Sequence, residues 1–208
     1  MPVRRSIFVS ASEDRLQKLI AERLEPGADK ESIDRRLWDL FGEEWCIMTT
    51  DLMGFSRSVA RFGIIHYLQT IYESERLLVP IIEQYDGIML KMEGDSFLVI
   101  FRNVQKALFA ALSMQRRLKI YNNKRIPEEQ VLLGIGLGFG RVMRISDEDV
   151  FGLEVNAAYV LGEDIAGAYE ILVSAAVREA AGDMKEIFEE LGDAPAGIGG
   201  AYRVRYDA

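Results

Sequence analysis

The stretch from Asp86 to Phe101, DGIMLKMEGDSFLVIF, constrains the fold more than any other part of this sequence. Two apolar runs flank a Glu-Gly-Asp turn, a pattern typical of a β-hairpin with a tight reversal. Gly94 supplies the backbone freedom that the reversal needs. We therefore expect Asp95 at the lip of a sheet, where its carboxylate can face a cation. An ordinary turn would also account for a Gly-Asp pair.

A second stretch, Cys46–Phe55, also places a carboxylate beside an apolar run. Its sequence, CIMTTDLMGF, is an apolar strand that ends on Asp51 and is followed by Gly54. A segment of helix length separates it from the hairpin. Two strands that each deliver a carboxylate predict a site for two metal ions, because Mg²⁺ prefers oxygen ligands.

Three motifs in register resemble the class III adenylate and guanylate cyclases. They are Asp51-Leu52-Met53-Gly54-Phe55-Ser56, Lys91-Met92-Glu93-Gly94-Asp95 and Asp149-Val150-Phe151-Gly152-Leu153-Glu154-Val155-Asn156-Ala157-Ala158. The resemblance covers roughly residues 44–176. It implies an α+β fold with a ferredoxin-like core, and the order of elements suits helices on one face of a mostly antiparallel sheet.

Composition argues against several other classes of protein. A net charge of −8 and a pI near 4.9 do not fit a nucleic-acid-binding surface. Nothing approaches the ~18 consecutive apolar residues of a membrane helix. The single cysteine, Cys46, precludes an internal disulfide, and the single histidine, His66, argues against Ser-His-Asp chemistry. We expect a cytoplasmic chain with no nucleic-acid partner and no membrane span.

The chain divides into an N-terminal helical extension, residues 1–43, and a cyclase-like catalytic domain, residues 44–208. Apolar residues recur at helical spacing in two segments of the extension. We expect these helices to pack against the core of the domain; dimerisation or coupling to a sensor is the alternative. A helix after Gly63 carries Ile64 and Leu68 on its apolar face, and Pro80 is expected to kink or divide it.

Glycine alternates with apolar residues in Val131–Arg141, VLLGIGLGFGR. Because no helix follows promptly, this pattern favours a strand closely approached by another backbone over a dinucleotide-binding loop. The rest of the sequence predicts a helix from near Gly152 to about Ile165, a helix over Lys185–Leu191 and a final edge strand over Ala201–Tyr206.

The resemblance implies the metal and phosphate ligands. Asp51 and Asp95, with the backbone carbonyl of Leu52, would bind two Mg²⁺ or Mn²⁺ ions per site. The amides of Met53–Ser56 open a helix and would hold the terminal phosphates. The substrate-binding residues in that stretch are Gly54, Phe55 and Ser56.

The resemblance also implies the choice of base and the assembly. Lys91 and Asp149 match the adenine-selecting version of the pair that reads the purine, in which lysine donates to N1 and the carboxylate accepts from the exocyclic amine. Asn156 resembles the residue that orients the ribose and is counted as catalytic with Asp51 and Asp95. A solvated strand residue and a helix N-cap are the plain alternatives for Lys91 and Asp149. The expected activity is an adenylate cyclase that converts ATP to cyclic AMP and pyrophosphate between the two chains of a homodimer.

Two departures from the family pattern count against full activity. Val160 stands where the family has a transition-state arginine, and the position of a second basic residue falls on Ala194 or Ala196. Arg141 or Arg144 could substitute from a neighbouring strand. The alternative function is a degenerate cyclase homology domain that binds nucleotide or dimerises for regulation without catalysis.

A third interpretation starts from the hairpin turn. Glu93-Gly94-Asp95-Ser96-Phe97 is similar to the turn of diguanylate cyclases. Those proteins lack the motif from Asp149 to Ala158, so this interpretation is the weakest of the three.

Overall fold

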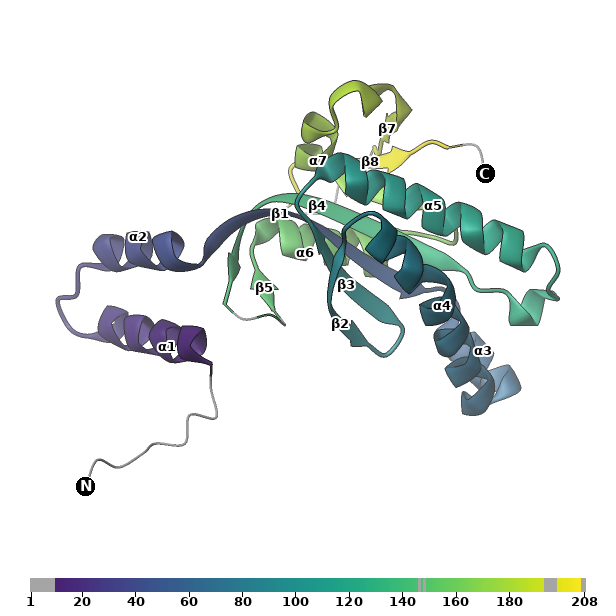
Figure 1. Ribbon diagram of the computed structural model, residues 1–208, viewed down its shortest axis with the longest axis horizontal. Coiled ribbons are helices and arrows are strands. Elements are labelled where there is room, and N and C mark those ends of the chain that lie inside the picture. The colour runs from purple at the N-terminus through teal and green to yellow at the C-terminus, as the bar shows by residue number, and fades with distance from the viewer. Residues whose placement is uncertain (1–9, 146, 148, 193–197, 207–208) are drawn as a thin grey trace.

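One large sheet with helices on it makes up most of the protein (Figure 1). The computed structural model describes residues 10–145, 147, 149–192 and 198–206, without the side chains of residues 55–58 and 185–186. The helical elements are α1 (Ala11–Leu24), α2 (Lys30–Phe41), α3 (Phe55–Phe62), α4 (Ile64–Gln84), α5 (Val104–Asn122), η1 (Pro127–Glu129), α6 (Leu153–Tyr159), η2 (Val160–Ile165), α7 (Ala175–Ala180) and η3 (Gly182–Ile187). The strands are β1 (Gly42–Leu52), β2 (Ile88–Glu93), β3 (Ser96–Phe101), β4 (Leu133–Arg144), β5 (Val150–Phe151), β6 (Ile171–Ser174), β7 (Phe188–Glu190) and β8 (Ala201–Val204).

The centre of the sheet has ferredoxin-like connectivity, as the sequence predicted. Within the described residues, eight strands form one sheet in the order β2-β3-β1-β4-β6-β8-β7, with β5 paired to β4. The run β1–α4–β2–β3–α5–β4 is the β-α-β-β-α-β unit of such a core. β1 is antiparallel to β3 and to β4, whereas β4 and β6 run parallel. The predicted α+β fold class with a mostly antiparallel sheet is confirmed.

Helices cover both faces of the sheet, so the expectation of a single covered face is wrong. Successive side chains of a strand point to opposite faces. Met48 therefore joins a core with Leu78 of α4 and Leu108 of α5, while its neighbour Ile47 packs with Val155 of α6. Both faces of β1 are apolar because each one receives a helix.

The glycines of β4 allow α6 and η2 to approach the sheet closely, as the alternating pattern predicted. A Cβ atom on Gly136 would lie 2.1 Å from the carbonyl oxygen of Ala158, and one on Gly138 would lie 2.0 Å from that of Glu154. Since backbone atoms cannot yield as a flexible side chain does, only glycine fits at these two positions.

The helix predicted from Gly152 to Ile165 changes its winding part-way along. It is α-helical over α6 and then continues as the π-helix η2, in which the amide of Ala166 donates to the carbonyl of Leu161 at 2.9 Å. The hydroxyl of Thr49 on β1 donates to the carbonyl of Ala158 at 2.7 Å. Wider winding of this kind is often found at functional sites. The Thr49 hydrogen bond therefore attaches the last turn of α6, just before η2, to β1.

The two N-terminal helices pack on each other instead of on the main core, contrary to expectation. Figure 1 shows α1 and α2 side by side, projecting from the end of the sheet. Their cluster of Leu19, Ile33, Leu37 and Phe41 packs against Met143, near the end of β4, and against Ile145, just after it. The amphipathic pattern of each helix is satisfied by its neighbour. The division of the chain near residue 43 remains a prediction.

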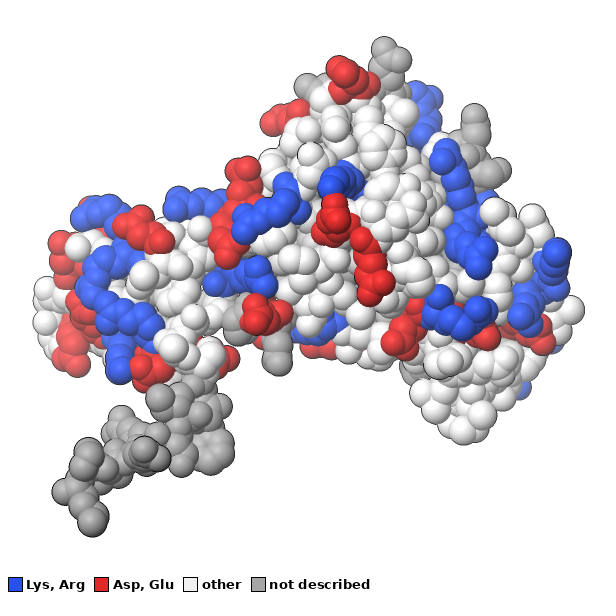
Figure 2. Space-filling model, viewed as in Figure 1, with Lys and Arg blue, Asp and Glu red and all other residues white. Residues whose placement is uncertain are grey.

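Ion pairs join the two helices across their polar sides. Arg23 donates to both carboxylate oxygens of Asp34, at 2.6 and 3.1 Å, and Arg36 lies 2.6 Å from Glu22. Figure 2 shows basic and acidic side chains intermixed over this part of the molecule. None of the described helices is long and apolar enough to cross a membrane.

Two local predictions are wrong, and a third is settled in part. Lys185–Leu191 is not a helix, because η3 ends at Ile187 and β7 follows; a short apolar run fits either structure, and here Phe188 pairs with Val204 of β8. That pairing also makes β8 an inner strand instead of the edge. α4 runs through Pro80 from Ile64 to Gln84, so Pro80 does not divide the helix, and the alternative of a kink stays a prediction.

Candidate active site

Asp51 and Asp95 meet at one end of the sheet. Asp51 is near the end of β1, and Asp95 follows Gly94 (φ +63°) in the β2–β3 turn. The β1–β3 register pairs Thr49 with Leu98, and its continuation sets Asp51 opposite Ser96. The amide of Phe97 donates to the Thr50 hydroxyl at 3.1 Å, which holds the turn against β1. Both carboxylates line one cavity of about 790 Å³, with Gly54, Tyr67 and Leu132 among its walls.

The electrostatics of this cavity favour a cation. Burial, with the neighbouring carboxylates of Asp95 and Glu163, raises the pKa of Asp51 to about 6. A hydrogen bond from the Leu52 amide to the Asp51 carboxylate opposes this rise. The pKa of Glu163 is also raised, chiefly by burial, against a hydrogen bond with Ser96. Crowded carboxylates of this kind lose their mutual repulsion when a divalent cation binds between them.

The donor set fits a metal that completes its coordination with substrate oxygens. Among the described residues, no group of three or more histidine, cysteine, aspartate or glutamate side chains is arranged to hold a metal ion. Mg²⁺ commonly binds to one or two carboxylates together with substrate phosphates. Asp51 and Asp95 satisfy that requirement.

Sequence reasoning missed two residues that act on the two carboxylates. Glu163 of η2 is near enough to raise the pKa of Asp51, and the hydroxyl of Tyr67 on α4 donates a hydrogen bond to Oδ2 of Asp95. Neither lies in a motif that resembles the family. The only sequence signal for Tyr67 is its place on the helix that connects the two carboxylate strands.

The predicted phosphate-binding turn is partly corrected. Gly54 adopts φ +92° and precedes α3, so the amides of Gly54, Phe55 and Ser56 open that helix as expected. The Met53 amide, in contrast, donates to the carbonyl of Leu132 at 2.8 Å. That amide is therefore committed to the fold, and the side chains of Phe55 and Ser56 lie outside the described parts of the chain.

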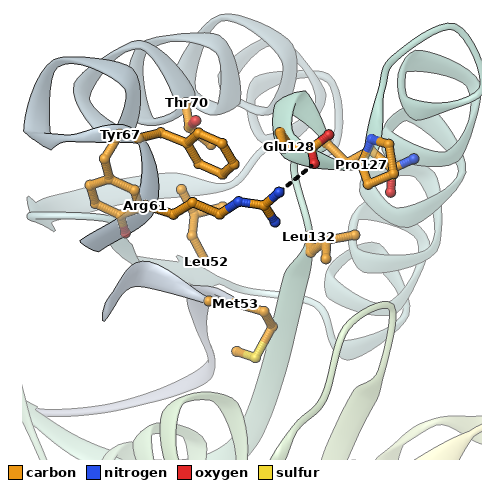
Figure 3. A pocket seen from close by; sticks show the side chains of 11 residues that line it. Leu52, Met53, Arg61, Tyr67, Thr70, Pro127, Glu128 and Leu132 are labelled. Atoms are coloured by element: carbon orange, nitrogen blue, oxygen red, sulfur yellow. Dashed lines mark ion pairs between the residues drawn. The ribbon is translucent and has the colours of Figure 1, made fainter. Parts of the chain in front are cut away.

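A second cavity lies beside the carboxylate cavity and shares Leu52, Met53 and Tyr67 with it (Figure 3). Its volume is about 260 Å³, and apolar side chains form much of its lining. Arg61 of α3 reaches across it to Glu128 of η1, with the charged atoms 3.6 Å apart. The shared wall includes the last residue of β1, Leu52, and the turn that follows it.

The structure brings the predicted purine-reading pair together. Nζ of Lys91 lies 2.9 Å from Oδ1 of Asp149 and 2.9 Å from a carboxylate oxygen of Glu93. Hydrogen bonds from the lysine to Glu93 and then to Asp149 raise the pKa of Lys91. The ammonium group is therefore charged at neutral pH. Its contact with Asp149 joins two motifs that are distant in the sequence.

Asn156 is exposed on α6, on the same side as Val160 one turn later. Val160 packs against the apolar cluster of Ala157 and Leu161. The two arginines considered as substitutes are engaged elsewhere: Arg141 lies 4.5 Å above the ring of Trp38, and Arg144 pairs with Asp147 at 3.1 Å. They lie toward the end of β4 that pairs with the start of β1, away from Asp51. Ala194 and Ala196 lie outside the described residues.

Comparison with solved structures identifies this architecture. An adenylate/guanylate cyclase/hydrolase from Silicibacter pomeroyi matches 80% of this chain and 98% of its own, with a TM-score of 0.71 and 27% identity. The chain has the class III cyclase fold. The predicted resemblance to the cyclase catalytic domains is confirmed.

Two curated proteins match the cyclase-like part of the chain. "Serine/threonine-protein kinase pkn2" of Myxococcus xanthus is 27% identical over 132 residues, which are 63% of this chain and 16% of that protein. "Putative adenylate cyclase 3" of Rhizobium meliloti (strain 1021) is 29% identical over 129 residues, which are 62% of this chain and 21% of that protein. The chain thus spans a small part of the length of either relative. No profile of a known protein family matches the chain.

Proposed function

We propose that this cyclase-fold protein is a nucleotidyl cyclase that converts ATP to cyclic AMP and pyrophosphate. The observation that carries the proposal is the pair Asp51 and Asp95, which line one cavity, where burial and then the charge of Asp95 raise the pKa of Asp51. This arrangement is unfavourable for a cavity without a cation, and it suits two-metal chemistry.

Asp51, Asp95 and the Leu52 carbonyl would hold Mg²⁺ or Mn²⁺, two ions per site. When bound, such ions promote ionisation of the ribose 3′-hydroxyl and neutralise the charge of the departing pyrophosphate. The amides of Gly54, Phe55 and Ser56, at the start of α3, bind the terminal phosphates. The protein itself aligns the 3′-oxygen with the α-phosphorus.

Base recognition falls to Lys91 and Asp149. Their ion pair places a donor beside an acceptor, which complements the acceptor N1 and the donor amine of adenine. Asn156, exposed on α6, orients the ribose. The Lys91 ammonium stays protonated beside its two carboxylate neighbours, so it acts as a donor throughout the neutral range.

Turnover is expected to be slow because Val160 cannot stabilise charge on the transferring phosphoryl group. Loss of one such donor typically costs ~10²–10³ in rate, and an arginine finger can be worth ~10³–10⁵. Arg141 packs on Trp38 and Arg144 pairs with Asp147, so neither replaces the missing arginine. Val160 is also the observation that favours the second candidate function, a degenerate domain that binds nucleotide or dimerises for regulation.

The complete site is proposed to form in a homodimer, with Asp51 and Asp95 of one protomer facing Lys91, Asp149 and Asn156 of its partner. Large apolar side chains are exposed near both halves. Their exposed fractions are 75% for Ile65, 52% for Leu68, 64% for Tyr72, 54% for Phe151 and 86% for Leu153. Ile64 and Leu68 had been expected on the buried face of α4, but they are exposed. A stable interface of at least ~1,000 Å² would cover such a surface.

Complementation between inactive chains tests both the reaction and the assembly. The purified protein is incubated with ATP, GTP, CTP or UTP and Mn²⁺, and the products are identified by mass spectrometry. Asp95→Ala and Asn156→Ala homodimers should be inactive, while a mixture of the two regains one intact site per heterodimer. If the wild type binds nucleotide but makes no cyclic product above the Asp95→Ala background, the regulatory candidate replaces the cyclase. An active wild type that stays monomeric, or exchanging subunits that recover nothing, would refute the shared site.

A further inference from the structure

The hydroxyl of Tyr67 makes a hydrogen bond that bears directly on the carboxylate site. Tyr67 lies on α4 and donates to Oδ2 of Asp95 in the β2–β3 turn. The residue is 4% exposed, so its hydroxyl reaches the cavity from the protein interior. A buried phenol generally requires a hydrogen-bond partner, but that partner need not be a carboxylate. In this protein the bond links Asp95, which lies in a short turn, to the rigid helix α4.

The ring of Tyr67 is held between two cavities. It lines the cavity that contains Asp51 and Asp95, and it also lines the neighbouring cavity with Leu52 and Met53. In Figure 3 the ring extends from its helix toward the end of β1. Packing on this wall fixes the position of the hydroxyl, because a tyrosine has few side-chain torsions.

The hydrogen bond leaves half of the carboxylate available. With Oδ2 of Asp95 accepting from the phenol, Oδ1 remains for another partner. A tyrosine phenol is protonated at neutral pH, so Tyr67 is the donor in this bond and the Asp95 carboxylate is the acceptor.

We propose that Tyr67 is a positioning residue of the metal site, whose hydroxyl orients the Asp95 carboxylate so that Oδ1 and Asp51 can bind the same divalent cation. The inference rests on the proposed function, since it takes Asp51 and Asp95 as the metal ligands. Partners that hydrogen-bond to a metal ligand typically change metal affinity 10–100-fold when they are removed.

The test replaces Tyr67 by phenylalanine, which keeps the ring and removes one oxygen. Mn²⁺ binding to the full chain is measured by electron paramagnetic resonance without nucleotide, and we expect the Kd of Tyr67→Phe to rise about 10–100-fold. Tyr85→Phe is the matched control: it removes a hydroxyl that bonds to Ser113 at 3.0 Å, just after the far end of α4, and it should leave the Kd unchanged. Circular dichroism and Tm report on the fold of each variant.

A double-mutant comparison separates positioning from simple stabilisation. If Tyr67 acts through Asp95, Tyr67→Phe should weaken residual Mn²⁺ binding no further in an Asp95→Ala background. A purely structural hydrogen bond would instead lower the Tm of Tyr67→Phe and leave its Mn²⁺ affinity at the wild-type value, which overturns the inference. If Mn²⁺ binding is lost in Asp51→Ala and Asp95→Ala but retained in Tyr67→Phe, the role of Tyr67 is overturned and the metal site still stands. A wild type that binds no Mn²⁺ overturns the metal site as well.

A measurement without any Tyr67 variant covers the case in which Tyr67→Phe does not fold. The chain is labelled with 3-fluorotyrosine and titrated with Mg²⁺ in a fluorine NMR experiment. One tyrosine resonance should shift and saturate with the metal in the wild type and remain fixed in Asp95→Ala. If saturating Mg²⁺ moves no tyrosine resonance, the phenol does not sense the site and the inference fails.

Discussion

Metal binding at this site should depend steeply on pH between about 5 and 7. The pKa of Asp51 is raised from its usual value near 4 to about 6 by burial, by Asp95 and by Glu163, in that order. A carboxyl of pKa 6 is about 9% ionised at pH 5 and about 91% ionised at pH 7. If only the ionised form binds the cation, apparent Mn²⁺ affinity should rise about tenfold between these values and little more above pH 7.

Isothermal titration of the wild type with Mn²⁺ from pH 5 to pH 8 measures this dependence. Glu163→Gln removes one of the repelling charges, so the midpoint should move toward lower pH. The movement should be partial, because burial is the largest cause of the shift. Glu31→Gln makes the same change on the exposed side of α2 and should leave the midpoint in place. An affinity that varies less than twofold from pH 5 to pH 7 would refute the reasoning.

The same shift has a consequence for stability, and its sign is opposite to that of metal affinity. Because folding raises the pKa of Asp51, the folded protein binds this proton more tightly than the unfolded chain does. The resulting stabilisation is complete below about pH 4 and is lost as the pH rises through about 6. Without metal, Asp51→Asn should therefore raise the Tm at pH 7.5 and change it little at pH 4.

Two further predictions concern the fold and the base. Gly136→Ala places a Cβ 2.1 Å from the Ala158 carbonyl oxygen, so it should lower the Tm by about 4–10 °C in calorimetry. Gly192→Ala serves as the control, because a Cβ at Gly192 meets nothing within 4 Å. A change below about 1 °C in Gly136→Ala would contradict the close approach. Lys91→Glu removes a donor and adds an acceptor, so relative binding should move from ATP toward GTP. An unchanged ratio in competition binding would mean that Lys91 does not read the base.

Local sequence patterns predicted the parts of the site that depend on local structure. The hairpin followed from two apolar runs and Gly94, and the end of β1 followed from an apolar run before Asp51. The close approach to β4 followed from glycines that alternate with apolar residues. In each case the residues that decide the geometry are neighbours in the sequence.

The parts that escaped prediction depend on contacts between distant segments. Glu163 acts on Asp51 from η2, the π-helical continuation of α6, and no helical periodicity in the sequence reveals that change of winding. In the sequence Tyr67 is one more apolar position of α4, and only the folded structure shows that the hairpin turn with Asp95 lies beside it. Likewise, the spacing of apolar residues in α1 and α2 predicts that one side of each helix is buried, but it does not identify the segment that the side packs against.

No loop separates the N-terminal helices from the strand that carries Asp51. α2 ends at Phe41 and β1 begins at Gly42, where a Cβ would lie 2.4 Å from the carbonyl oxygen of Trp38. β1 then runs without interruption for 11 residues, about 35 Å at the usual rise of an extended strand. A rotation of α2 would therefore move β1 directly, and with it the Asp51 carboxylate near the far end of the strand. For anyone fusing a ligand-responsive module to this protein, the length and helical phase of the junction before α1 become the variables that decide whether the module can control the site.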